Sequence, residues 1–263
     1  MSPRSLPARL VQSLLALALL IAIVAATANG ERTQYGSLVV SLRGEFSPLK
    51  LPRDRAAPVS IRLAGGLRTT DGSTLPRVTQ IALGLPGQGK LDAGGLPTCG
   101  VRKLRDATVE EALSNCRSAL VGRGTLTADM LIPNQPPFRI DAGLLAFNGR
   151  VGGHAAVLLH AFSARPPTVV VLPFLIRHRT GRFATTLVAH LPPSLGPWPH
   201  IAHFEMELSR RYAYRGRSRS YLSASCPIPA RFTAGFFSFA RAIFTLAGGR
   251  DVSTAIARGC RAR

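Results

Sequence analysis

Most of the chain consists of short runs in which apolar and polar residues alternate. In one of them Val59, Ile61 and Leu63 alternate with Ser60 and Arg62. A period of two is typical of a β-strand with one buried face. Similar runs cover 38–42, 59–63, 78–85, 120–131, 144–151, 155–162, 169–176, 183–191, 204–214, 221–226, 236–246 and 252–257. This spacing predicts an all-β chain, an antiparallel β-sandwich of jelly-roll type with roughly 10 to 12 strands.

Short glycine-containing segments separate several of these runs, and we interpret them as hairpin turns. They are Gly65-Gly66, Asp71-Gly72, Gly87 to Gly89, Asn148-Gly149, Gly152-Gly153 and Gly248-Gly249. Glycine adopts the positive φ that tight turns require.

One short helix is expected among the strands. Thr108 precedes Glu111 by three residues, which is the spacing of a capping box. Val109, Ala112 and Leu113 then form a short apolar face that leads toward Cys116.

The first 28 residues have the features of a signal peptide. Two arginines precede an uncharged apolar run, and Ala26-Thr27-Ala28 supplies a cleavage site of small residues. The alternative is an uncleaved anchor, because the apolar stretch 10–28 is long enough to span a bilayer. We expect a signal peptide at 1–28 and a single secreted β-sandwich domain at 29–263.

The four cysteines, Cys99, Cys116, Cys226 and Cys260, all follow this leader. An even number in an exported chain predicts two disulfides, which also suits a secreted or cell-envelope location. Of the three possible pairings, the most local joins Cys99 to Cys116 and Cys226 to Cys260. A zinc site is the alternative, but the chain has no C-x-x-C pair.

The chain is strongly basic, with a formal net charge of +20. Such a charge attracts anions, and outside a cell these are anionic cell-wall polymers and membrane surfaces. Nucleic acid is an unlikely partner, since no nucleic-acid-binding motif is present. The sequence predicts no cofactor and leaves the oligomeric state open.

Arg215, Arg217 and Arg219 are the candidate anion-binding residues. They cluster around Gly216, with tyrosines interleaved, and guanidinium groups bind phosphate or carboxylate oxygens in pairs. The alternative is a solvated hairpin whose tyrosines pack inward.

Glu205 and Glu207 are weak candidates for catalysis, because residues two apart on a strand share a face and glycoside hydrolases use carboxylate pairs. The segment resembles the E-x-D-x-x-E strand of jelly-roll glucanases, but Glu207 replaces the aspartate and Arg210 the last glutamate. The alternative is a solvated strand face. His200 and His203 with Glu205 form an even weaker candidate metal site, and we predict no metal.

Several segments resemble a group of exported β-rich proteins of high-GC actinobacteria that has no assigned activity. They are Leu-Pro-Thr-Cys at 96–99, Leu-Val-Gly-Arg-Gly at 120–124, Leu-Ala-Phe-Asn-Gly at 145–149, the run 211–229 and Arg-Gly-Cys at 258–260. The resemblance implies secretion and a shared β domain, and it transfers no catalytic residue. We therefore expect a non-catalytic binding or structural module with affinity for anionic envelope polymers, with a carbohydrate-active hydrolase using Glu205 and Glu207 as the alternative.

Overall fold

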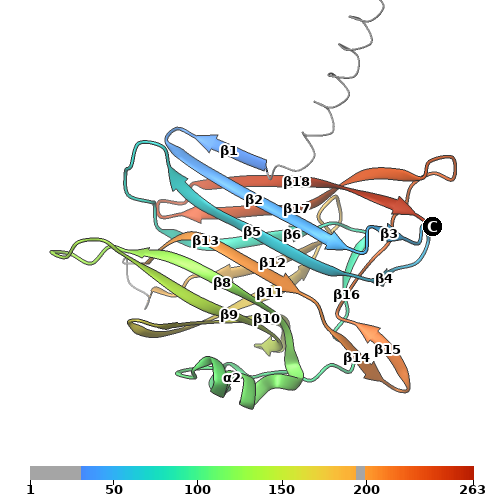
Figure 1. The fold of residues 1–263 in the computed structure, drawn as a ribbon, viewed down its shortest axis with the longest axis horizontal. Helices are drawn as coiled ribbons and strands as arrows, with labels where there is room; N and C mark the ends of the chain where they lie inside the picture. The colour runs from blue at the N-terminus through green and yellow to red at the C-terminus, as the bar shows by residue number, and fades with distance from the viewer. Residues whose placement is uncertain (1–30, 194–198) are drawn as a thin grey trace, which may run out of the picture. The chain divides into compact units, whose positions relative to one another are not determined.

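The alternating runs form strands of one large curled sheet in a computed structural model of the chain, which describes residues 31–193 and 199–263 (Figure 1). The predicted signal peptide lies outside the described residues. Across the sheet, the order is β1 (Glu31–Tyr35), β2 (Leu38–Ser47), β5 (Ser60–Thr69), β13 (Pro199–Leu208), β8 (Leu120–Met130), β9 (Phe138–Val151), β10 (His154–Ala164), β11 (Pro167–His178), β12 (Thr185–His190), β6 (Val78–Leu85), β17 (Ala234–Leu246), β18 (Asp251–Ala262) and β3 (Lys50–Leu51). All neighbours are antiparallel except β18 and β3.

The predicted all-β class is confirmed, whereas the expected two-sheet sandwich is not, because these strands join in one continuous hydrogen-bonded ladder. The sheet curls so far that β2 lies beside β18, and the chain thereby buries one face of each strand as a sandwich would. At this seam the Tyr35 hydroxyl donates to the Ser253 carbonyl (2.8 Å) and accepts from the Ser253 amide (3.0 Å). Arg258 adds a hydrogen bond to the Gly44 carbonyl. Strand periodicity is the same in both arrangements, so it did not distinguish them.

Two of the predicted glycine turns lie inside strands instead. Gly66 is within β5, where a side chain would overlap the carbonyl of Ala202 in β13. Gly149 is within β9, where a side chain would strike Leu158. Both glycines thus permit close approach of neighbours, one of the uses of glycine in strands. Beside Gly66, β13 has a bulge between Ile201 and His203, and bulges increase the local twist of a sheet.

The strands bury side chains on two sides of the sheet. The larger core fills the inside of the curl, and a smaller one lies outside β9 and β10. In β9, Leu144 and Ala146 face inward while Leu145 and Phe147 join the outer core. The outer core is covered by α2 (Val109–Cys116) with the 3-10 turns η1 (Val101–Lys103) and η2 (Arg117–Ala119).

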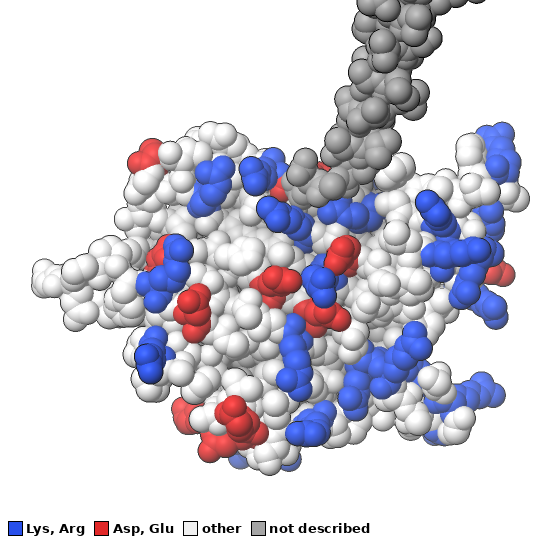
Figure 2. All heavy atoms as spheres, in the orientation of Figure 1, with Lys and Arg blue, Asp and Glu red and all other residues white. Residues whose placement is uncertain are grey.

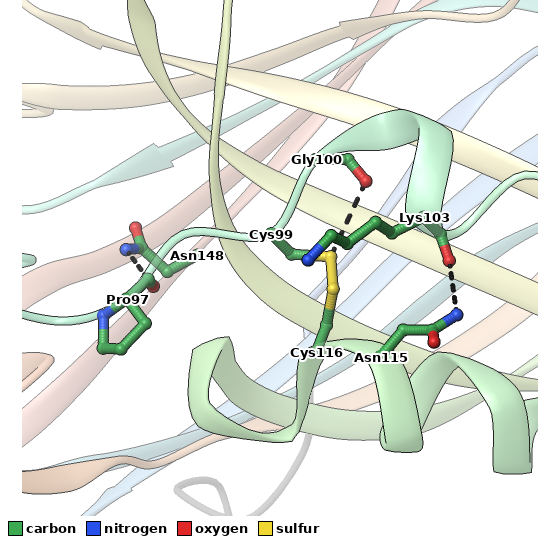
Figure 3. The surroundings of a disulfide bond; sticks show 7 residues. All are labelled: Pro97, Cys99, Gly100, Lys103, Asn115, Cys116 and Asn148. Carbon is green, nitrogen blue, oxygen red and sulfur yellow. Dashed lines mark hydrogen bonds between the residues drawn. A yellow bond between two sulfur atoms is a disulfide. The ribbon is translucent and has the colours of Figure 1, made fainter.

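The predicted helix and its tether are confirmed. The Thr108 hydroxyl accepts from the Glu111 amide, and the Glu111 carboxylate accepts from the Thr108 amide, which completes the capping box. The hydrogen bond from the Thr108 amide lowers the pKa of the Glu111 carboxyl group. A disulfide joins Cys99 to Cys116 at the far end of the helix (Figure 3). The second disulfide joins Cys226 to Cys260, so both pairings are the local ones.

Two small sheets complete the fold. One contains β4 (Ala57–Pro58), β16 (Leu222–Ala224) and β7 (Gly89–Leu91), and the other is the hairpin of β14 (Arg211–Tyr214) and β15 (Arg217–Ser220). Residues 31–263 contain both disulfides and both cores and form one compact unit, as expected of a domain that folds by itself. No helix within the described residues is both long and apolar enough to cross a membrane.

Candidate binding cavity

An apolar cavity of about 240 Å³ lies inside the curl of the sheet. Its walls are the inner faces of eight strands that are consecutive in the sheet, from β5 through β13, β8, β9, β10, β11 and β12 to β6. Along β10 the lining runs from Val157 to Ser163, a length of about 20 Å at the rise of an antiparallel strand. This length is sufficient for an extended hydrocarbon chain.

Several of the side chains that line the cavity are only partly buried. Phe204, Met206 and Leu208 of β13 face those of β10 and β11, including Leu159 and Val170, and all five keep some accessible surface. A close-packed interior would leave these residues buried. These positions are therefore less closely packed than the fully buried part of the inner core.

The space ends where the inner core becomes tightly packed. Leu63 of β5 lines the cavity, whereas Ile61, two residues away on the same face, borders a separate space of about 20 Å³. There Phe46 packs against Phe237 and Phe239, with ring centroids 5.6 Å apart in each pair. The cavity is thus a local feature of the arc from β5 to β6.

Two hydroxyl-bearing residues give the cavity a polar end. Ser163 and Thr168 are register partners in β10 and β11, beside the turn that contains Arg165. Every other lining side chain is apolar. The Ser163 hydroxyl donates to the Arg165 carbonyl (3.3 Å), and Thr168 is exposed. This arrangement suits a ligand with a long apolar part and one polar end.

The residues that line the cavity were not predicted as a site from the sequence. A usable signal was present, since the inward positions of β8, β9 and β10 include the small residues Ala128, Ala142, Ala146 and Ala161. Small side chains on the concave face of a curled sheet leave space that larger ones would fill.

Glu205 and Glu207 lie on the outer face of β13, away from the cavity. Both carboxylates contact Arg62 of β5, at 3.9 Å and 2.9 Å, and Glu45 of β2 contacts the same guanidinium at 3.2 Å. Hydrogen bonding and charge attraction from Glu207 raise the pKa of Arg62. Figure 2 shows acidic and basic side chains intermixed on this face. The three carboxylates surround one guanidinium on a solvated strand face.

The three candidate anion-binding arginines are on the β14–β15 hairpin. Arg215 and Gly216 form its turn, both with positive φ, and Arg215 and Arg217 are exposed. Neither forms an ion pair within residues 31–193 and 199–263. Arg219 instead contacts Asp92 (3.1 Å). Arg215 and Arg219 lie 5.3 Å and 5.4 Å from the centre of the Tyr214 ring. The hairpin thus presents two free guanidinium groups.

The histidines considered as metal ligands do not gather into a site. The bulge in β13 separates His200, which is buried, from His203, which is exposed. Among the described residues, no three histidine, cysteine, aspartate or glutamate side chains are grouped to hold a metal ion.

Comparison with known proteins adds no functional assignment. No protein-family model, curated protein or solved structure matches the chain.

Proposed function

We propose that this protein is an exported, non-catalytic binding protein that holds the hydrocarbon part of an amphiphilic molecule in its interior cavity. The observation that carries the proposal is the 240 Å³ space lined by apolar side chains. Its volume exceeds that of engineered apolar cavities of about 150 Å³ that stay dry and bind small hydrophobic molecules. The two disulfides suit an oxidising, extracytoplasmic location.

A ligand that fills a cavity of this size gains many contacts with its apolar walls. At about 24 cal/mol per Å³, filling 240 Å³ corresponds to roughly 6 kcal/mol. The whole free energy of unfolding of a typical domain is about 5 to 15 kcal/mol. A ligand that made these contacts would stabilise the fold substantially.

The polar end of the cavity predicts the orientation of the ligand. The hydroxyl group of Thr168 can donate to an oxygen-rich head group, while methylene groups extend along β9, β10 and β13. Arg165, exposed in the adjacent turn, favours a negatively charged head group. A long-chain fatty acid is the simplest molecule with this chemistry.

The proposal is tested by titrating residues 31–263 with a fluorescent long-chain fatty acid. We expect saturable binding that unlabelled hexadecanoic acid displaces. Ala142→Phe, which places a ring in the cavity, should abolish it, whereas the outward-facing Thr125→Ser should leave it unchanged. Saturable binding that is equal in the wild type and Ala142→Phe, or no binding to the wild type, would refute the proposal.

A second candidate function is adhesion to an anionic cell-wall polymer through the β14–β15 hairpin. The free guanidinium groups of Arg215 and Arg217 favour it. Neutralising both with glutamine should remove retention on immobilised teichoic acid at moderate salt. Unchanged retention would dismiss the hairpin as the binding element.

The hydrolase alternative rests on Glu205 and Glu207. Their shared contact with Arg62 supports a structural role instead, because one guanidinium holds both carboxylates on the solvated outer face of β13, away from the cavity. Glu205→Gln should therefore leave any polysaccharide-degrading activity of the preparation unchanged.

A further inference from the structure

The fold has an end where exposed apolar side chains stand among basic ones. Phe236 is 80 % exposed, Leu49 53 % and Phe232 48 %, and no other large apolar residue in the described parts of the chain is comparably exposed. Leu49 belongs to segment 48–56, and Phe232 and Phe236 belong to segment 227–236. Together with segment 258–263, which adjoins both, these segments form what we call the basic tip. Most surface apolar residues are scattered singly, so a group of three on adjoining segments suggests an interaction surface.

The three segments are joined to one another. Phe236 of β17 lies opposite Gly259 of β18, and Arg261 of β18 lies opposite Lys50 of β3. The disulfide between Cys226 and Cys260 adds a covalent link between the start of segment 227–236 and segment 258–263. The basic tip is therefore one surface, although its parts are far apart in the sequence.

One arginine, Arg53, fixes the loop that carries Phe232. Its guanidinium donates to the carbonyls of Ile228 (2.8 Å), Pro229 (2.9 Å) and Phe232 (2.8 Å). The Cys226 amide also donates to the Pro52 carbonyl (2.8 Å). A preorganised loop loses little conformational entropy on binding. The exposed ring of Phe232 is therefore held in a position where it can contact a partner.

Charge around these side chains is strongly positive. The three segments contain seven lysines and arginines, against Asp54 and the C-terminal carboxylate. Figure 2 shows basic side chains gathered at the right end of the view, where β3 and the C-terminus lie in Figure 1. Arg231 lies 5.0 Å from the ring centre of Phe232, so charge and apolar surface are interleaved.

We propose that the basic tip docks on an anionic phospholipid bilayer, with Phe232, Phe236 and Leu49 entering the headgroup region and the surrounding arginines contacting lipid phosphates. Aromatic and aliphatic side chains flanked by Lys and Arg are the features of proteins that bind at a membrane interface. A soluble anionic polymer would use the guanidinium groups but has no apolar layer to receive the rings. Two copies of this tip would repel each other.

The test is flotation of residues 31–263 with vesicles of phosphatidylglycerol and phosphatidylcholine. The wild type should float with these vesicles and not with pure phosphatidylcholine. Phe232→Ser combined with Phe236→Ser keeps every charge and should weaken binding at least about tenfold, because burial of even one phenylalanine is worth that factor. An unchanged melting temperature and intact disulfides establish that this variant is folded.

A matched control removes charge elsewhere. Arg102→Gln with Arg105→Gln removes two exposed charges beside η1, outside the basic tip and the β14–β15 hairpin, and should change vesicle binding by less than about twofold. If this variant loses binding while the double serine variant keeps it, the basic tip is not the contact. Vesicle binding by the double serine variant equal to that of the wild type would likewise overturn the proposal, and so would a wild-type dimer that these serines dissociate.

The docking surface is separate from the cavity, so the two proposals fail independently. The double serine variant should bind the fluorescent fatty acid as the wild type does. Loss of fatty-acid binding in this variant would show that Phe232 and Phe236 support the cavity rather than a membrane contact.

Discussion

Replacing Ala142 with phenylalanine tests whether the interior of the curl is truly unfilled. Ala142 lies on the inner face of β9, lines the cavity and is only half-buried. Full burial of a phenylalanine side chain contributes about 1.5 to 3 kcal/mol. Fixing its rotamer costs part of this, about 0.5 to 1 kcal/mol. We therefore expect Ala142→Phe to raise the free energy of unfolding by about 1 to 2 kcal/mol.

The matched control is Ala156→Phe, on the opposite face of the sheet. Ala156 of β10 is fully buried in the outer core, where no space is available. The same substitution there forces its neighbours apart and should cost about 1 to 3 kcal/mol. Since both sites are in strands, the higher strand propensity of phenylalanine affects both alike. The opposite signs of the two changes measure the difference in packing.

Urea unfolding at equilibrium, followed by circular dichroism, is the assay. In a domain of this size, the gain at Ala142 corresponds to a rise in melting temperature of roughly 2 to 8 °C. If Ala142→Phe destabilises the protein as much as Ala156→Phe does, the inner face is packed and the reasoning about the cavity is wrong.

Two further predictions concern polar side chains with few contacts to solvent. The Nε2 atom of His160 lies 2.8 Å from the Ala107 carbonyl, and burial lowers the pKa of this side chain. The folded state therefore keeps His160 neutral at pH values where the unfolded chain, with a pKa near 6.5, already binds a proton. The free energy of unfolding should therefore fall as the pH drops below about 6.5. Chemical denaturation at several pH values should show a smaller fall in His160→Gln than in the wild type. Equal falls in the two proteins would contradict this assignment. At the seam, Tyr35→Phe leaves the amide and carbonyl of Ser253 without their partner and should cost about 1 to 3 kcal/mol. Amide exchange at Ser253 should accelerate in this variant, and an unchanged exchange rate would show that the seam does not depend on the hydroxyl.

The local features of the fold could be predicted because each depends on residues close in sequence. The capping box joins Thr108 to Glu111, three residues away, and the first disulfide spans 17 residues. Strand positions also followed from the alternation, although the run 204–214 is divided into β13 and β14. The glycines at 66 and 149 were misread because a turn and a crowded strand both require glycine, and only the neighbouring strand distinguishes them.

The candidate sites depended on pairings that no local pattern contains. Arg62 meets Glu207 across a separation of 145 residues, and Arg53 holds a loop more than 170 residues away. β13 lies between β5 and β8, neither of which precedes or follows it directly in the chain. These pairings decide which exposed charges are neutralised and which stay free.

By itself, the sequence determined that the chain forms strands, where its short helix begins, and which side chains of most strands share a face, since all of these follow from periodicity and from neighbours a few residues away. Only the tertiary structure decided that the strands make one curled sheet, that its concave side holds an unfilled apolar space, and that distant basic and aromatic residues meet at one end. The physical reason is that the alternation of apolar and polar residues along a strand is the same whether its inward-facing side chains contact the opposite wall or not. The distance between the walls is set by the curvature of the whole sheet.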